Sequence, residues 1–146
     1  MKVDILAFGV HPDDVELGCA GTLIASVAAG KKVVVVDLTR GELGTRGSVE
    51  TRKTEAAAAA AVMGLAAREN LEMADGFFSH DESNVKKIIA VIRKYKPEIV
   101  LCNAPEDRHP DHGRSSKLVS DAAFLAGLRK IDTTLDDEAQ KAWRPS

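Results

Sequence analysis

Apolar and polar residues alternate along this chain in blocks whose lengths suit strands and helices in turn. Two apolar runs, Val3–Val10 and Lys32–Thr39, predict strands. The second run is rich in β-branched residues, which favours a parallel strand that is covered on both faces. Between them, Val15–Ala29 carries apolar residues at helical spacing and stops at Gly30, a residue that favours the end of a helix. The N-terminal part of the chain therefore predicts a β-α-β unit.

The same alternation continues through most of the remaining chain. A glycine-rich loop follows the second strand, and an alanine-rich segment then favours a helix, because alanine has the highest helix propensity. The further predicted elements are a helix from Ser48 to Gly64, a weaker strand over Arg68–Met73, a helix over Asp81–Lys96 that Pro97 stops, a strand over Glu98–Ala104, and a helix over Arg114–Leu128.

This order of elements predicts an α/β fold, with a Rossmann-like parallel sheet that is flanked by helices. Ligands of such open sheets bind beyond the carboxyl ends of the strands. Three polar segments follow predicted strands: HPDD, TRGELGTRG and PEDRHPDHG. We therefore expect these three segments to meet at one rim of the sheet, although they lie far apart in the sequence.

The composition is that of an ordinary globular protein, and 146 residues suffice for one domain over residues 1–146. The net charge of −2 gives no indication of a nucleic acid or an anionic membrane as a partner. No apolar run is long enough to cross a membrane, and the N-terminus lacks the pattern of a signal peptide. These features favour a cytoplasmic protein, in which Cys19 and Cys102 are reduced core residues.

The C-terminal segment from Leu128 to Ser146 is polar, and no other predicted strand is available to pair with it. It also contains Trp143, the single tryptophan. Four strands make a small sheet for a doubly wound domain. We therefore expect the chain to be a fragment of a longer domain, or to be cut in a connecting loop.

The tetrad HPDD, residues 11–14, places an imidazole and carboxylates at a strand-to-helix turn. Pro12 suits the first position of a helix, so His11 and Asp14 would straddle the turn and could bind one divalent metal. Two ligands are too few for a stable site, so a third must come from elsewhere. The alternative is that Asp13 or Asp14 caps the helix, with Glu16 as a helix-start charge or a residue behind the site.

The tetrad HPDH, residues 109–112, can supply that third ligand. Three of the four histidines lie in the two tetrads, and only His80, which we expect on the surface, lies outside them. The set His11, Asp14 and His112 would leave a coordination position open for water, as catalytic zinc requires. Iron(II), cobalt and nickel suit the same donors. The alternative is that the histidines of HPDH are solvated loop residues.

The remaining polar residues of the two tetrads can move protons. Asp13, His109 and Asp111 are of the types that act in proton transfer, and a carboxylate beside a histidine can orient its ring. Two arginines, Arg52 and Arg108, lie where they could bind a substrate anion or its hydroxyl groups, or they are ordinary surface residues.

Nucleotide binding is disfavoured. The segment RGELGTRG lacks the Gly-Lys-Ser/Thr ending of a phosphate-binding loop, and GVHPDDVELG does not fit GxGxxG. Its acidic residues would also repel a pyrophosphate. We expect the glycines instead to let the loop approach a substrate closely.

The pairing of HPDDVE with a distal HPDH resembles the LmbE-like superfamily of N-acetylglucosamine deacetylases, also called the PIG-L family. The resemblance runs from ILAFGVHPDDVELG through DLTRGELGTRG and ETRKTEA to PEDRHPDHG, so it covers almost the whole chain. The segments LTRGELGTRGS and ETRKTEAAAAA look most like the bacillithiol-biosynthesis subgroup, which deacetylates N-acetylglucosaminyl malate.

The resemblance implies a role for each residue of the site and a Rossmann-like fold without a nucleotide. It implies that one zinc ion is bound by His11, Asp14 and His112 and that Asp13 is the general base. It also implies that His109 stabilises the oxyanion or donates a proton and that Asp111 orients His109. Arg52 would lie beside the substrate.

Together these features predict a zinc-dependent hydrolase that removes the acetyl group from a small N-acetylated sugar, with Arg52 or Arg108 meeting the carboxylates of a malate group. One alternative is a metal hydrolase of another N-acyl or N-carbamoyl amide, and another is a non-catalytic metal- or sugar-binding module. Family members continue with further strands that wall the substrate site and contribute to oligomer contacts. The resemblance therefore implies that residues 1–146 are the N-terminal catalytic portion of a single LmbE-like deacetylase domain, and it allows a homo-oligomer.

Overall fold

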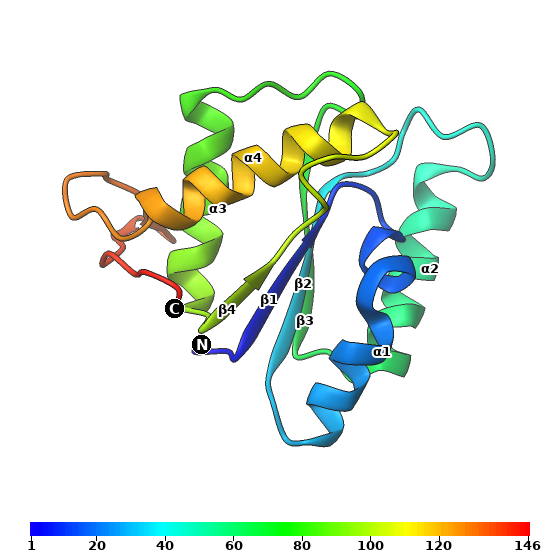
Figure 1. The fold of residues 1–146 in the computed structure, drawn as a ribbon, viewed down its shortest axis with the longest axis horizontal. Helices are drawn as coiled ribbons and strands as arrows, with labels where there is room; N and C mark the ends of the chain where they lie inside the picture. The colour runs from blue at the N-terminus through cyan, green and yellow to red at the C-terminus, as the bar shows by residue number, and fades with distance from the viewer.

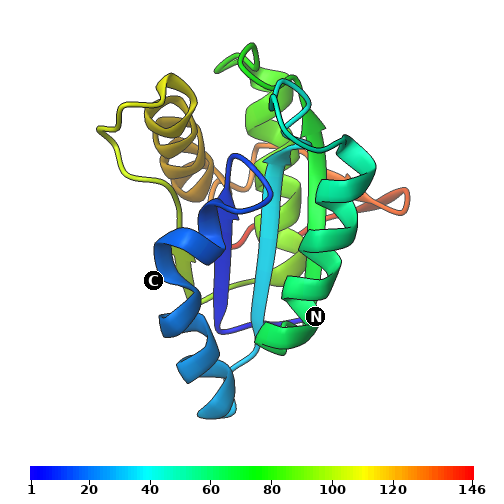
Figure 2. The same ribbon diagram turned by 90° about the vertical axis from the view of Figure 1, so that its right-hand side faces the viewer.

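Four parallel strands form the central sheet of the computed structural model, which describes residues 1–146. Their order across the sheet is β3 (Ala67–Met73), β2 (Val33–Thr39), β1 (Ile5–Gly9) and β4 (Ile99–Leu101). The helices lie on both faces: α1 (Asp14–Ala28) and α2 (Val49–Met63) on one, α3 (Glu82–Tyr95) and α4 (Pro110–Leu125) on the other (Figure 1). Figure 2 looks onto the face that α1 and α2 cover. The predicted fold class is therefore confirmed.

The apolar runs of β1 and β2 are buried along their whole lengths because helices cover both faces of the sheet. Successive side chains of β1 point to opposite faces. Leu6 and Phe8 join the larger core, which lies between the sheet and helices α3 and α4. Ile5 and Ala7 join the smaller core under α1 and α2.

The helix boundaries follow local signals in the sequence. The Ser48 hydroxyl accepts a hydrogen bond from the Thr51 N–H at 3.1 Å and so caps the N-terminus of α2. Gly64 ends that helix with φ of 68°, a left-handed conformation that glycine adopts without strain. One boundary differs from the prediction: α4 begins at Pro110, not at Arg114. The HPDH tetrad therefore opens a helix and is not part of a loop.

The C-terminal segment packs against the α3 and α4 side of the molecule. The Trp143 indole N–H donates to the Pro97 carbonyl at 2.8 Å. The segment also forms a small antiparallel hairpin that the sequence did not predict, β5 (Thr134–Leu135) with β6 (Glu138–Ala139). Its two turn residues, Asp136 and Asp137, both have positive φ, as a tight hairpin turn requires.

The predicted burial of the cysteines is wrong for Cys102, which is exposed just after the short edge strand β4. Cys19 is half-buried, and both thiols are free. None of the helices has both the length and the apolar character that a membrane span requires.

Candidate metal centre

The two histidine tetrads meet because the strands before them are neighbours. HPDD follows β1, HPDH follows β4, and these strands pair in parallel. The carboxyl ends of both strands therefore deliver their tetrads to the same rim of the sheet.

Three side chains at this rim converge on one point. The Nδ1 atom of His11 lies 3.6 Å from Oδ2 of Asp14, and Nε2 of His112 lies 3.3 Å from the same oxygen. One ligand atom from each of these residues lies within 4.8 Å of the others. The structure thus brings together the three residues that the sequence nominated as metal ligands.

A set of hydrogen bonds holds the Asp14 carboxylate in place. Its Oδ2 accepts from the backbone N–H groups of Val10 and His11 at 2.9 and 3.0 Å, and from the Asn103 amide at 3.1 Å. Asp14 therefore reaches back over the turn and does not cap α1. Burial raises the pKa of Asp14, but the bonds from His11 and Asn103 outweigh it and hold that pKa well below its ordinary value. The carboxylate is ionised, as a metal ligand must be.

One buried nitrogen at this point lacks a hydrogen-bond partner. The Nε2 atom of His112 is enclosed and unsatisfied, since its close approach to Asp14 is not aligned as a hydrogen bond. Buried polar atoms are rarely left without a partner unless an ion or a water completes the site. Two imidazole nitrogens and one carboxylate oxygen suit Zn²⁺, and they also suit Fe²⁺ and Co²⁺. The residues present therefore fit a divalent metal.

His109 lies beside this donor set. Its ring centroid is 4.9 Å from that of His11 and 4.9 Å from that of His112, with the latter pair stacked. Its Nδ1 accepts a hydrogen bond of 3.3 Å from the Asp111 backbone N–H. His11, His109 and Asp111 form a second group whose ligand atoms lie within 4.8 Å of one another.

The Asp111 carboxylate is fully buried and is engaged elsewhere. It accepts hydrogen bonds of 2.8 Å from the Gly76 N–H and from the Arg114 guanidinium. The resemblance implied that Asp111 orients His109. In the structure Asp111 contacts the His109 ring through its backbone N–H, while its carboxylate binds Gly76 and Arg114.

Asp13 lies outside the donor set, with about half of its side chain exposed. It occupies the N-cap position of α1, yet its carboxylate makes no capping hydrogen bond. The Arg52 guanidinium of α2 lies 3.8 Å from it. A Cβ atom on Gly44 would stand 2.9 Å from Arg52 Nη2, and one on Gly41 would stand 3.1 Å from Arg52 Nη1. These glycines of the loop therefore make room for Arg52, where the sequence had suggested room for a substrate.

Two other predicted residues lie apart from this cluster. Arg108 is exposed on the loop before α4, and its side chain forms no ion pair within the chain. His80 is exposed, as expected, and pairs with Asp121 of α4 at 2.9 Å.

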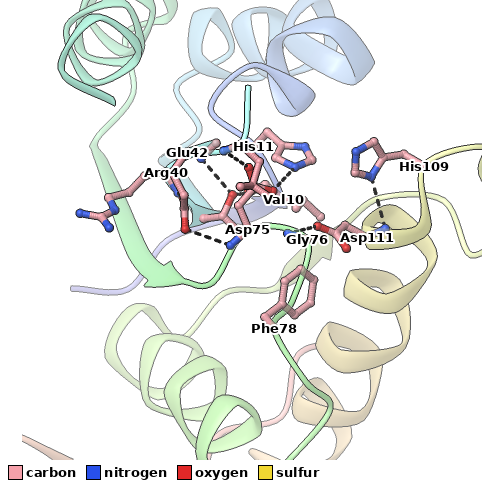
Figure 3. A network of polar contacts seen from close by, with 12 residues as sticks. Val10, His11, Arg40, Glu42, Asp75, Gly76, Phe78, His109 and Asp111 are labelled. Carbon is pink, nitrogen blue, oxygen red and sulfur yellow. Dashed lines mark hydrogen bonds and ion pairs between the residues drawn. The ribbon is translucent and has the colours of Figure 1, made fainter. Parts of the chain in front are cut away.

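Sequence reasoning missed three residues that contact the predicted ligands. Asp75 lies 3.0 Å from Nε2 of His11 (Figure 3), Asp107 lies 3.1 Å from Nδ1 of His112, and Asn103 holds Asp14. Asp75 follows β3 at the same rim, and that position was the one signal available. Glu16, which the sequence left open, lies behind the site and pairs with Arg68, whose guanidinium also binds Asp37.

Residues 6–123 match the family described as GlcNAc-PI de-N-acetylase, PIG-L. The match covers most of the chain and includes both tetrads. The chain belongs to the PIG-L family. The resemblance of the two tetrads to this family is therefore confirmed, while the bacillithiol subgroup is not established by the match.

Within the family, the chain is similar to the diacetylchitobiose deacetylase of Thermococcus kodakarensis, with 33% identity over 134 residues. The alignment covers 85% of this chain and 50% of that protein. The chain thus spans about half the length of this relative.

Several solved structures share the fold. The conserved protein TT1542 from Thermus thermophilus is 40% identical, with a TM-score of 0.88, and the alignment covers 98% of this chain and 63% of that one. The N,N'-diacetylchitobiose deacetylase from Pyrococcus horikoshii, in complex with an inhibitor, is 25% identical, also with a TM-score of 0.88, over 98% of this chain and 58% of that one. The Rossmann-like sheet is therefore that of PIG-L family structures.

Proposed function

We propose that this chain carries the catalytic site of a metal-dependent deacetylase that acts on an N-acetylglucosamine derivative. One observation carries the proposal: His11, Asp14 and His112 converge on one point, while Asp13 and His109 lie beside them without joining that donor set. A set of metal ligands with separate proton-handling groups suits metal-assisted hydrolysis of an amide.

A zinc ion bound by His11, Asp14 and His112 would acidify a water and polarise the acetyl carbonyl. The protein residues then have two proton transfers to perform. The Asp13 carboxylate accepts the proton of the attacking water, and the nearby Arg52 guanidinium keeps it in place. The water oxygen bonds to the acetyl carbonyl carbon, and the C–N bond breaks when the departing nitrogen takes up a proton, which gives acetate and a free amine.

His109 is arranged to act as a donor in this reaction. Its Nδ1 accepts the Asp111 N–H, so in the neutral ring the proton resides on Nε2. That N–H can hydrogen-bond to the developing oxyanion or supply the proton of the leaving amine. The His109 ring lies 4.9 Å from each of the two histidine ligand rings, which supports a donor role beside the metal.

The substrate class is supported by the relatives, two of which are named as deacetylases of diacetylchitobiose. Within that class we propose N-acetylglucosaminyl malate, as in bacillithiol biosynthesis. Arg108 supports the choice of an anionic sugar derivative, because it is exposed and has no ion-pair partner in the chain. Arg52 is less available, since it is already beside Asp13.

Acetate release by metal-free and zinc-reloaded protein tests the proposal, with N-acetylglucosamine, diacetylchitobiose and N-acetylglucosaminyl malate as parallel substrates. We expect release only by the zinc-loaded protein, with the highest kcat/KM on the malate derivative. Arg108→Ala should raise KM about 10-fold for the malate derivative alone, because the other two substrates carry no carboxylate. Arg129→Ala, another exposed arginine, is the matched control.

Two results would replace this proposal. Zinc binding without acetate release from any sugar would indicate a metal- or sugar-binding module. Hydrolysis confined to other N-acyl or N-carbamoyl amides would indicate a hydrolase with the same centre and a different pocket.

A further inference from the structure

A turn after β3, at Asp75 and Gly76, lies outside both tetrads and contacts each of them. Asp75 and Gly76 follow β3, and the Asp75 carboxylate lies 3.0 Å from Nε2 of His11 while the Gly76 N–H donates to Asp111 (Figure 3). The turn thus contacts HPDD through a side chain and HPDH through the backbone. It is a third segment of the site, contributed by a third strand.

The Asp75 carboxylate is fixed independently of the histidine. Only 7% of the residue is exposed, and its second oxygen accepts the Leu43 N–H at 3.0 Å. Its own N–H donates to the Glu42 carboxylate at 3.0 Å. The next residue, Gly76, has φ of +73°, and a Cβ there would stand 2.9 Å from Leu43 Cδ1. The turn is therefore seated against the glycine-rich loop in one conformation.

A carboxylate in this position selects one form of the imidazole. A neutral histidine carries one N–H, and the Asp75 oxygen can accept only if that N–H is on Nε2. The lone pair of His11 then lies on Nδ1, the nitrogen that faces Asp14.

His112 has the opposite arrangement. Its Nδ1 lies 3.1 Å from the Asp107 carboxylate, while its Nε2 is the buried nitrogen without a partner beside Asp14. Asp107 itself is held by the His109 backbone N–H at 2.8 Å. The two imidazoles therefore present different nitrogens to the same point.

We propose that Asp75 and Asp107 are positioning residues that fix opposite tautomers of the two histidine ligands, so that His11 binds the metal through Nδ1 and His112 binds it through Nε2. Carboxylates behind metal-bound histidines orient the rings and increase their basicity. The inference rests on the metal centre of the proposed function, and it adds which atoms bind the metal and which residues select them.

The first test uses the unaltered, zinc-loaded protein labelled with ¹⁵N in its histidines. We expect two-bond ¹H–¹⁵N spectra to show a zinc-bound Nδ1 with a protonated Nε2 in one ring, and a zinc-bound Nε2 with a protonated Nδ1 in another. His80→Gln, which removes a histidine outside the site, simplifies the assignment. Zinc on the same nitrogen of both rings would overturn the proposal.

The second test measures the Zn²⁺ dissociation constant of Asp75→Asn and Asp107→Asn by competition with a chelator. In Asp75→Asn one of the two oxygens becomes an NH₂ group, which cannot accept from His11 or Leu43. We expect each variant to bind zinc about 10- to 100-fold more weakly than the unaltered protein. Values within twofold of the unaltered protein for both variants would overturn the proposal.

Asp121→Asn is the matched control, because it removes a carboxylate from the exposed His80 pair and leaves the site untouched. We expect its zinc affinity to be unchanged. If Asp75→Asn fails to fold, Asp107→Asn decides, since Asp107 lies on an exposed loop. Neither measurement uses a substrate, so a protein that binds zinc as described but releases no acetate would refute the proposed function alone.

Discussion

The Arg52 guanidinium lies 3.8 Å from the Asp13 carboxylate and so joins α2 to the turn that opens α1. Arg52 can reach this position because Gly41 and Gly44 carry no side chains. The base proposed for the reaction therefore depends on a loop that is distant in sequence.

The first prediction concerns that loop. Gly44→Ala places a Cβ atom 2.9 Å from Arg52 Nη2 and 3.1 Å from the Gly41 carbonyl oxygen, so the guanidinium must shift from its position beside Asp13. We expect kcat/KM for acetate release to fall on the order of 10-fold. Gly21→Ala on α1, where a Cβ meets nothing within 4 Å, should leave it unchanged. Unaltered kcat/KM in Gly44→Ala would argue against a role for Arg52.

The second prediction separates the base from the metal ligands. Asp13→Asn should lower kcat about 10²- to 10⁴-fold, because an amide cannot accept the proton of the attacking water. Zinc content per chain, measured by atomic emission, should stay at the level of the unaltered protein, since Asp13 lies outside the converging donor set. An equal loss of zinc would instead make Asp13 a ligand.

The third prediction concerns Arg93, which is 3% exposed and holds the turn after α4. Its guanidinium donates to the carbonyl groups of Ala126, Leu128 and Ile131. Arg93→Ala removes these three bonds and leaves the Ile131 carbonyl without a partner, while the Ala126 and Leu128 carbonyls keep backbone donors. The free energy of unfolding in urea should therefore fall by about 2–4 kcal/mol. Arg129→Ala, exposed on the same turn, should change it by less than about 0.5 kcal/mol. A fall of similar size in both variants would contradict the role of Arg93.

The fourth prediction concerns the pH dependence of stability. Burial raises the pKa of Asp37 to about 6, against the hydrogen bonds from Arg68 that lower it. Because this pKa exceeds the ordinary value of 3.8, the folded protein binds the proton more tightly than the unfolded chain does. The stabilising contribution of Asp37 is therefore complete below pH 3.8 and is lost as the pH rises through about 6.

Carboxyl ¹³C NMR measures this directly. We expect the Asp37 resonance to titrate with a midpoint near 6. The stability of the unaltered protein relative to Asp37→Asn should fall across the same pH range. A midpoint below the ordinary value would mean that the bonds from Arg68 outweigh burial.

The sequence predicted the sheet and its helices well because both signals are local. β-branched runs marked the strands, and Ser48, Gly64 and Pro97 marked helix ends. The start of α4 was placed too late, although Pro110 stands at the first helical position that proline favours. The same expectation was wrong for Pro12, because α1 begins at Asp14 and Pro12 precedes its N-cap residue, Asp13. The hairpin at Asp136 and Asp137 was missed because two aspartates are a weak signal for a turn with positive φ.

The sequence predicted that the two tetrads meet, because the carboxyl ends of parallel strands lie at one rim of the sheet. The contacts of Asp75 with His11 and of Asp107 with His112 could not be predicted in the same way. Asp75 contacts His11 only because β3 ends at that rim and its turn packs on the glycine-rich loop. Apart from its position just after the third predicted strand, nothing in the sequence around Asp75 indicates that contact, since it depends on the order of strands across the sheet.

Crystallography of the zinc-loaded protein at the zinc absorption edge tests the metal centre most directly. We predict a single anomalous peak at about 2.0–2.2 Å from His11 Nδ1, from an Asp14 carboxylate oxygen and from His112 Nε2. A peak held by His109 and Asp111, or none between the two tetrads, would contradict the centre described here.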